Sequence, residues 1–287
     1  MSMDAAKQAG RAQRAIEPLH SMVYFAPDAE ATFVQAGLRP GRMCYFAPRA
    51  APMGAVGGGP VTATFYNFNP AIVARHVPRC WGLVAPERLI ELRFEVAEAA
   101  LRRLLGDEAI DSPELAELAE LTEQAATGCD AVGRPMYAAH ADLSWPDGPT
   151  HLRLWHAVTL LREHRGDGHV AALVGHGLGG LDALVTHTET GRGFLPQSAQ
   201  ATRGWSVEEW DAAVTGLRSR GLVGDDGLTE LGTALRTSIE NETDQLGRAP
   251  WDQLGAAGTA RVIELGKTFS RTVIGNGAFP PGVFASR

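Results

Sequence analysis

The sequence has little cysteine and almost no lysine. Its three cysteines, Cys44, Cys80 and Cys129, are scattered with no Cys-x-x-Cys pair, so neither a disulfide framework nor a thiolate metal site is indicated. Only Lys7 and Lys267 contribute lysine to the 26 basic residues, and the rest are arginines. This bias fits a GC-rich bacterial genome and by itself says nothing about chemistry.

Long hydrophobic runs are absent as well. No stretch approaches the roughly 20 apolar residues of a membrane helix, and residues 1–14 lack the apolar core of a secretory signal. We therefore expect no membrane partner and a cytoplasmic protein. With 287 residues, the chain can bury a large core and has room for two domains of ordinary size.

The segment from Ser206 to Thr243 has the pattern of a recognition helix, a hairpin wing and a following helix. Residues 217–223 predict a helix that stops at Gly221 in the left-handed conformation and continues into a strand. A turn and the start of the next helix follow at 224–232. This order resembles the winged helix-turn-helix of the MarR family of ligand-responsive regulators. The wider resemblance runs from about residue 20 to 274, and it implies a dimer formed by the terminal helices.

The charges of this segment are unfavourable for DNA. The predicted recognition helix carries Glu208, Glu209 and Asp211 in its first turns, at the end that would approach base edges. These carboxylates are also favourable for the helix itself, because they face its positive N-terminal dipole. Residues 201–275 contain eleven acidic and eight basic residues, so phosphates would be repelled. The sequence therefore argues against DNA as a partner.

The predicted fold class is mainly α with short β-hairpin wings (α+β), arranged as two winged-helix-like modules. The first module spans residues 12–127. Its wing would consist of strands at 43–46 and 61–68, because the second segment alternates β-branched and aromatic residues. Helices are expected at residues 12–25, 28–36, 69–76, 86–105 and 112–127.

A loop-like linker at 128–150 is predicted to precede the second module, which spans 151–275 and leaves a tail at 276–287. Besides the winged segment, this module is expected to contain helices at 151–165, 168–175, 180–190 and 257–274. The last helix places four apolar side chains on one face: Val262, Leu265, Phe269 and Val273. That face is either the subunit interface of a homodimer or an ordinary core face.

The densest group of functional side chains lies at residues 154–173. Gly166 is expected to end one helix in the left-handed conformation, and Asp167 to cap the next one. His164 shares a helical face with apolar residues and should point inward, while His169 lies in the first turn of the following helix. The two imidazoles would then converge on a cavity between the modules. The alternative is a capped helix corner with a satisfied core histidine.

On this basis, His164, His169 and Asp167 are predicted as catalytic acid–base groups. Arg165 would contact an anion, and so would Arg49, which lies in a Gly/Pro-rich loop. Further ligand contacts are expected from Trp155 as a pocket wall and from His156, Glu163, Tyr66 and Asn67. The histidine spacing fits neither a zinc nor an iron pattern, so no metal is predicted and the cofactor stays open.

The sequence thus predicts a small-molecule-binding winged-helix protein with a degraded DNA-binding surface, and an enzymatic use of its pocket in bacterial secondary metabolism is left open. The alternative is a MarR-type ligand-responsive transcriptional regulator. Its basic surface would come from Arg192, Arg203, Arg218 and Arg220. A third interpretation is a carrier or self-resistance protein that sequesters a hydrophobic metabolite.

Overall fold

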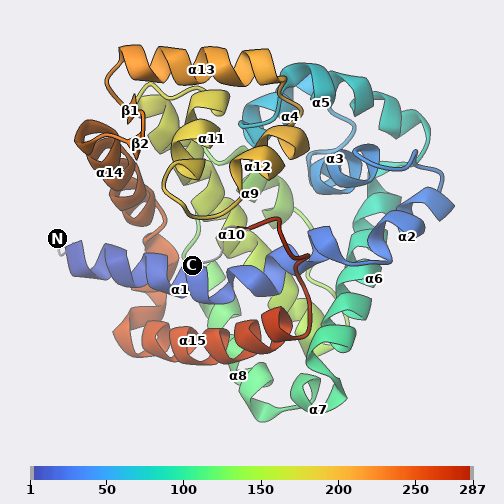
Figure 1. The fold of residues 1–287 in the computed structure, drawn as a ribbon. Coiled ribbons are helices and arrows are strands. Elements are labelled where there is room, and N and C mark those ends of the chain that lie inside the picture. The colour runs from blue at the N-terminus through green and yellow to red at the C-terminus, as the bar shows by residue number, and fades with distance from the viewer. Residues whose placement is uncertain (1–2, 285–287) are drawn as a thin grey trace.

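Within residues 3–284, which the computed structural model describes, the chain is mainly helical and has a single two-stranded antiparallel sheet (Figure 1). The elements are α1 (Met3–Ser21), α2 (Ala29–Gln35), α3 (Met43–Ala50), α4 (Gly58–Phe65), α5 (Pro70–His76), α6 (Pro86–Leu105), α7 (Asp107–Ile110), α8 (Pro113–Ala126), α9 (Pro135–Ala141), α10 (Thr150–Gly175), α11 (Gly180–Thr188), α12 (Pro196–Arg203), α13 (Val207–Ser219), β1 (Val223–Gly224), β2 (Gly227–Leu228), α14 (Glu230–Leu246) and α15 (Ala249–Gly275). No helix of the described range is long and apolar enough to cross a membrane.

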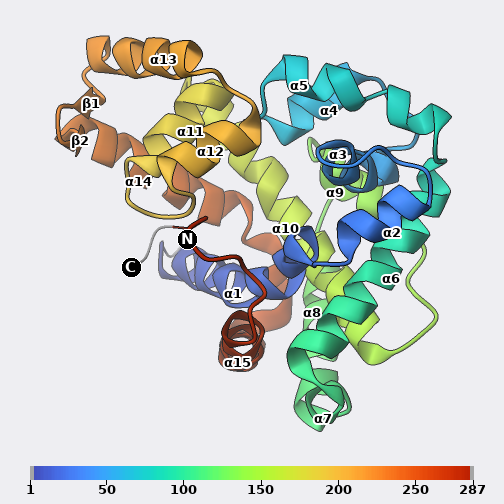
Figure 2. The same cartoon turned by 45° about the vertical axis from the view of Figure 1, so that its right-hand side comes forward.

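The long helix α10 is the centre of the molecule. It packs against α1, α6, α8, α9 and α14, and Figure 2 shows it passing between the α11–α12 segment and α3. A helix with neighbours on every side needs apolar or satisfied side chains all round. In α10, buried residues accordingly occur on all faces.

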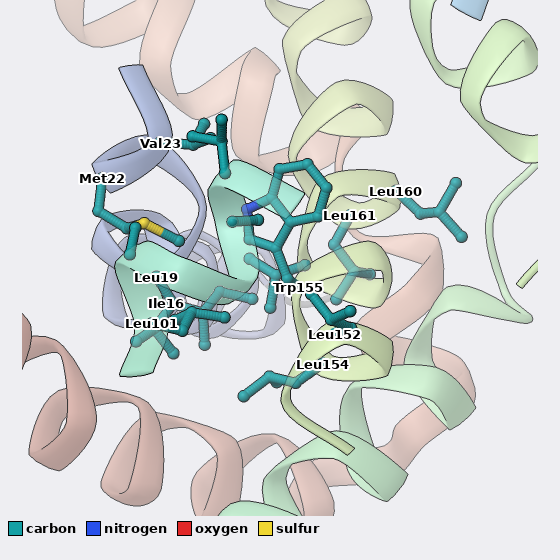
Figure 3. Packing of buried hydrophobic residues seen from close by; sticks show 14 of the residues in the cluster. Ile16, Leu19, Met22, Val23, Leu101, Leu152, Leu154, Trp155, Leu160 and Leu161 are labelled. Atoms are coloured by element: carbon teal, nitrogen blue, oxygen red, sulfur yellow. The ribbon is translucent and has the colours of Figure 1, made fainter. Parts of the chain in front are cut away.

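The buried apolar residues form two clusters. The larger joins α1, α3, α6, α8, α15 and the first half of α10. In Figure 3, Trp155 of α10 lies among Ile16, Leu19 and Val23, which come from α1 and the turn after it. The smaller cluster joins the end of α10 to α11, α13, the hairpin and α14. The larger cluster therefore contains residues from both sides of the predicted linker at 128–150.

The winged segment has the predicted form. Ser206 and Glu209 cap α13 reciprocally, as a capping box. Gly221 has φ 69° and ends the helix turn, and β1 then pairs with β2 in the register Val223 with Leu228. The helix α14 follows at Glu230. Local signals therefore determined this part of the fold.

The predicted first wing is wrong. Residues 43–46 lie in helix α3, and residues 61–68 lie mostly in helix α4. Met43, Phe46 and Ala47 are buried at helical spacing, and so are Val61 and Phe65. Burial of these faces outweighs the few tenths of a kcal/mol by which β-branched residues disfavour helix. The predicted loop-like linker at 128–150 likewise contains a helix, α9.

The predicted glycine corner in α10 is also wrong. The helix is continuous through Gly166, Asp167 and Gly168. A Cβ at Gly168 would lie 2.9 Å from Nη1 of Arg134 and 3.1 Å from Cβ of Leu246. This glycine therefore permits a close approach of neighbouring elements, which offsets its cost of about 1 kcal/mol within a helix.

The apolar face of α15 belongs to the core of the same chain. This helix starts at Ala249, earlier than predicted, and is kinked at Gly255 with φ 80°. It packs mainly on α1 and α8. Oγ of Ser270 donates to the carbonyl of Ala15 at 2.7 Å, and Gly266 lets Ile16 approach closely. The stripe from Val262 to Val273 is consequently not an exposed subunit interface.

Candidate functional site

A cavity of about 420 Å³ lies beside the middle of α10, and we call it the α10 cavity. Its wall is formed by α3, by the end of α4 and the loop after it, by α10 from Arg162 to Leu173, and by α11, α12 and α14. Pockets of this size are typical of small-molecule sites. Its lining residues run from Tyr45 to Glu240, so no local sequence window could reveal it.

The helix-turn-helix borders this cavity. The helix α12 ends at Arg203, the turn consists of residues 204–206, and α13 begins at Val207. Gly204 has φ 76° and lets Ile72 of α5 approach so closely that a Cβ would lie 2.9 Å from it. The last residue of α12 lines the cavity. The first helix of the motif thus forms part of the cavity wall.

Arg49 is a buried cation that forms no direct ion pair in the described part of the chain. Burial lowers its pKa, but interactions with Tyr45, Tyr24 and Glu163 outweigh burial and hold that pKa above its ordinary value. Its Nη1 donates to Oη of Tyr45 at 2.7 Å, and its Cζ lies 4.2 Å from the ring centroid of Phe65. Its Nε has no hydrogen-bond partner, and within residues 3–284 it forms no ion pair. Burying an unpaired charge is costly, and buried arginines normally pair with carboxylates.

Arg203, at the end of α12, has a similar arrangement in the wall of the same cavity. Its Nη1 donates to Oγ1 of Thr202 at 2.8 Å, and its Cζ lies 4.5 Å from the ring of Phe194 and 4.9 Å from that of Phe68. Its Nε is unpartnered too, and no carboxylate of the described chain pairs with it. Burial lowers the pKa of Arg203, and the positive charge of Arg49 contributes to the decrease. The two cations therefore act on each other across the cavity.

Tyr45 lies between these two arginines. Burial raises the pKa of its phenol, but the positive charges of Arg49 and Arg203 outweigh burial, so its pKa lies below the ordinary value. The ring packs against Phe46 and Phe68 at centroid distances of 5.6 and 5.4 Å. The phenol thus offsets part of the positive potential of the two arginines, and a ligand anion would offset the rest.

The other arginines of the cavity wall have carboxylate partners. Nη1 of Arg162 lies 2.7 Å from Oε1 of Glu163, and Nη2 of Arg165 lies 2.8 Å from Oδ1 of Asp244. A third pair, at 3.2 Å, joins Arg236 to Glu240 on α14. Among the arginines of the cavity wall, Arg49 and Arg203 therefore differ from the other three in having no direct carboxylate partner within the described residues. A further buried arginine, Arg93, lies outside this cavity and donates to Nε2 of His140 at 3.1 Å.

The two predicted carboxylates line the cavity and already have structural tasks. Burial raises the pKa of Glu163, but Arg162 and Arg49 outweigh it and hold that pKa well below its usual range. Oδ2 of Asp167 accepts the backbone N–H of Tyr137 at 2.9 Å. Asp167 therefore caps α9, and the prediction that it caps a helix starting at residue 168 is wrong because α10 is continuous there. Burial raises its pKa to about 6.

His169 lines the cavity and has a defined tautomer. Oγ1 of Thr243 donates to the carbonyl of Ile239 at 2.7 Å, so that oxygen accepts the Nδ1–H of His169 at 2.8 Å. Nε2 then carries the lone pair. Burial lowers the pKa of His169 to about 4, which keeps the imidazole neutral. Its catalytic role stays a prediction.

His164 does not reach the α10 cavity. Since α10 is continuous, five residues separate it from His169 along one helix, and the two side chains lie on different faces. The ring of His164 is fully buried against Tyr137, with a centroid distance of 5.4 Å, and neither ring nitrogen has a hydrogen-bond partner. Burial lowers its pKa to about 4. The predicted convergence of the two imidazoles is wrong.

Trp155 and His156 also lie away from the cavity. Trp155 is stacked on His20 in the main core, so it is not a pocket wall. His156 packs edge-on against Trp145 at 4.7 Å. The side chain of Arg165 borders the cavity, but its guanidinium is held by Asp244 of α14. The geometry therefore brings together His169, Asp167, Glu163, Arg165, Arg49, Tyr66 and Asn67 of the predicted residues.

Tyr66 and Asn67 connect the cavity to the helix-turn-helix. Oη of Tyr66 donates to the carbonyl of Leu178 at 2.5 Å, and Nε1 of Trp205 donates to the carbonyl of Asn67 at 2.9 Å. Tyr66 has φ 52°, a rare value outside glycine. The carbonyl of Tyr66 lies against Gly180, where a Cβ would be 2.0 Å from it. The loop after α4 is thereby fixed to α11 and to the turn before α13.

Sequence reasoning missed Arg203 and Arg162 as cavity residues. Arg203 was assigned to an exposed basic surface, but it is enclosed by Phe68 and Phe194. A signal was available in the sequence, because Arg203 ends a short segment just before Gly204 and Trp205, where a helix end would bury it. Arg218 and Arg220 are indeed exposed, and each pairs with an aspartate, Asp225 and Asp182 respectively.

The exposed face of α13 is acidic. Glu208 and Asp211 are solvent-exposed in its first turns. Nδ2 of Asn69, at the start of α5, donates to both carboxylate oxygens of Glu209 at 3.2 Å. Figures 1 and 2 both show α5 beside α13 at the top of the molecule. The end of α13 that would enter a DNA groove is therefore both acidic and bordered by another helix of the same chain.

Together these features describe a helix-turn-helix protein with a hairpin wing and an internal cavity behind the motif. A sequence model described as a helix-turn-helix family matches residues 9–280, and the chain belongs to that family. No curated protein and no solved structure matches the chain. Within residues 3–284, no three His, Cys, Asp or Glu side chains lie together so that they could hold a metal ion.

Proposed function

We propose that this protein binds a small molecule in the α10 cavity and no longer depends on DNA. The observation that carries the proposal is the buried guanidinium of Arg49, which faces a cavity and has no carboxylate partner among residues 3–284. A charge of this kind is costly unless something answers it. A bound ligand supplies the missing partner.

The electrostatics of the motif support independence from DNA. Affinity for duplex DNA grows with the number of phosphates that Lys and Arg neutralise. In α13 the exposed first turns carry Glu208 and Asp211, and the arginines at its far end pair with aspartates. The helix–hairpin–helix order from Val207 to Leu246 supports a MarR-like winged helix as the origin of this unit.

Mass spectrometry tests the proposal directly. Native spectra of the freshly purified protein are compared with spectra of the same sample after denaturation. We expect a native mass above the 30.6 kDa of the chain by the mass of a small organic molecule, and loss of the excess on denaturation. Arg102→Met, which removes an exposed arginine far from the cavity, should retain the molecule. The proposal would be contradicted if the native mass equalled the chain mass in two samples: the protein in cell extract, and the purified protein after incubation with cell extract.

The second candidate function is a ligand-responsive regulator, and Arg203 is the observation that favours it. This residue belongs both to the cavity wall and to α12, the first helix of the motif. A ligand held by Arg203 would shift the position of α12 and with it that of α13. Tight, salt-sensitive binding to duplex DNA that a cavity ligand changes would favour this candidate.

A further inference from the structure

A second, more apolar pocket adjoins the α10 cavity. Its volume is about 640 Å³, and it shares Tyr45, Phe68, Phe194, Arg162 and Arg203 with the cavity. The shared residues include both the aromatic rings around Arg203 and the phenol that contacts Arg49. The two spaces therefore meet at Arg203, while Arg49 lines only the α10 cavity of the two and reaches the boundary through its hydrogen bond to Tyr45.

The far wall of this pocket is built from aromatic side chains of distant segments. The ring of Phe25 lies 5.4 Å from that of Phe279 and 5.8 Å from that of Phe284. Phe284 also packs on Phe194 at 4.7 Å, and the backbone N–H of Leu195 donates to the carbonyl of Val283 at 3.1 Å. The C-terminal segment thus covers an apolar space that begins at the cationic site.

The free edges of the two guanidinium groups define what can bind there. In both Arg49 and Arg203, Nη1 is already engaged, and Nε has no partner. The Nε–Nη2 edge of arginine binds two oxygens of one anion in parallel. Elsewhere in this chain, Arg261 uses that edge on Glu117, at 2.9 Å from Nε and 2.7 Å from Nη2. Arg49 and Arg203 have the same edge without an internal carboxylate, but both Nε atoms are closed to solvent, so each guanidinium must turn for the whole edge to reach an anion.

We propose that the ligand is an amphipathic organic anion, whose carboxylate or phosphate head is bound by Arg49 and Arg203 and whose apolar body lies in the pocket under Phe25, Phe279 and Phe284. This inference rests on the proposed function and specifies its ligand class. Aromatic rings around both arginines exclude water and strengthen the charge-assisted hydrogen bonds to the head. The volume of the apolar pocket limits the size of the apolar body that can bind.

Calorimetric titration with four probes tests the inference: decanoate, decanol, butyrate and decyl phosphate. Decanol has the body without the charge, butyrate has the charge without the body, and decyl phosphate tests the alternative head. We expect one of the two long anions to bind at least about tenfold more tightly than both decanol and butyrate, because decanol lacks the charge-assisted hydrogen bonds and butyrate lacks the apolar body. The better anion identifies the head group.

Two variants assign the recognition to the arginines. Arg49→Met and Arg203→Met should each reduce the preference for the long anion over decanol by about tenfold or more, while Arg102→Met, which removes an exposed charge, keeps it. Circular dichroism shows whether each variant is folded, and Arg203 is the less buried of the two. Equal binding of decanol and the anions by the wild type would leave a small-molecule cavity but overturn the anionic ligand. Absence of binding by all four probes at millimolar concentration overturns the inference, and if the native mass also shows no bound molecule, the proposed function fails with it.

Discussion

Nη1 of Arg49 donates to the phenol oxygen of Tyr45 at 2.7 Å, and this hydrogen bond stands where a buried guanidinium usually has a carboxylate. Burial raises the pKa of this phenol, but Arg49 and Arg203 hold it below its ordinary value, so the phenol offsets part of their positive charge. The result is a site with residual positive potential inside the protein, next to an apolar pocket.

Glu163 should be the carboxylate whose loss is most damaging. It is buried, it forms an ion pair with Arg162, and its negative charge offsets part of the positive charge of Arg49. In Glu163→Gln the half-buried Arg162 loses that partner and keeps only Glu17 at 3.8 Å, so we expect the free energy of unfolding to fall by about 1.5–3 kcal/mol. Glu123→Gln removes the partner of the exposed Arg153 and should cost less than about 1 kcal/mol. Urea denaturation measures both, and equal effects would contradict the assigned role.

Acid should destabilise the protein through its buried histidines. Burial lowers the pKa of His140 to about 3 and that of His156, His164 and His169 to about 4. Between pH 6.5 and 4 the unfolded chain binds protons at these positions and the folded chain does not, so stability falls as pH falls. Each histidine contributes up to about 1.4 kcal/mol per pH unit. Asp167, with a pKa raised to about 6, acts in the opposite direction.

His164→Phe separates this effect from ligand binding. The ring of His164 has no hydrogen-bond partner and does not line the cavity. The variant should flatten the dependence of unfolding free energy on pH between 6 and 4.5 by about 1.4 kcal/mol per unit and should leave ligand retention unchanged. Denaturation at several pH values gives the slope. If His164→Phe lost the ligand, His164 would have to be assigned to the functional site after all.

Gly180 should be essential for the contact between α11 and the loop after α4. A Cβ there would lie 2.0 Å from the carbonyl oxygen of Tyr66, which is backbone and cannot move freely. We expect Gly180→Ala to cost roughly 2–3 kcal/mol and to weaken ligand retention, because Tyr66 and Asn67 line the cavity. Gly179→Ala is the matched control, since no atom lies within 4 Å of its Cβ position. Equal melting temperatures for the two variants would show that this contact is not tight.

The acidic face of α13 should prevent binding to duplex DNA. Fluorescence anisotropy with a random duplex should show no salt-sensitive binding by the wild type. The double variant Glu208→Lys, Asp211→Lys should bind the duplex, because two exposed negative charges become positive, and should release it as the salt concentration rises. Micromolar binding by the wild type that weakens steeply with salt would instead support the regulator.

The winged segment could be predicted from sequence because its signals are local. Ser206 and Glu209 form a capping box, and Gly221 supplies the left-handed stop, all within a few residues of the elements they define. The strands predicted around Gly57 were wrong because the deciding factor, burial of Phe46 and Phe65 against distant helices, cannot be read from a short window.

The candidate site shows the same limit. Arg49, Tyr66 and Asn67 were identified because arginine and polar groups stand out among apolar neighbours. Arg203 was misplaced because Phe68 and Phe194 enclose it in the folded chain. Phe68 lies more than a hundred residues before Arg203, so this contact cannot be read from a local segment. The glycine corner in α10 failed for a related reason. Gly168 is needed for contact with Arg134 and Leu246, which only the folded chain brings near it.

The central claim, that Arg49 and Arg203 bind the head of an anionic ligand, is tested most directly by the proton–nitrogen NMR spectrum of the arginine Nε–H groups. Assigned by loss in Arg49→Met and Arg203→Met, these two resonances should move to lower field when the long anion is added, because Nε–H groups that lack a partner acquire one. Decanol should leave both unchanged. If the anion binds and neither resonance moves, these arginines do not hold the head group and the account of the site is wrong.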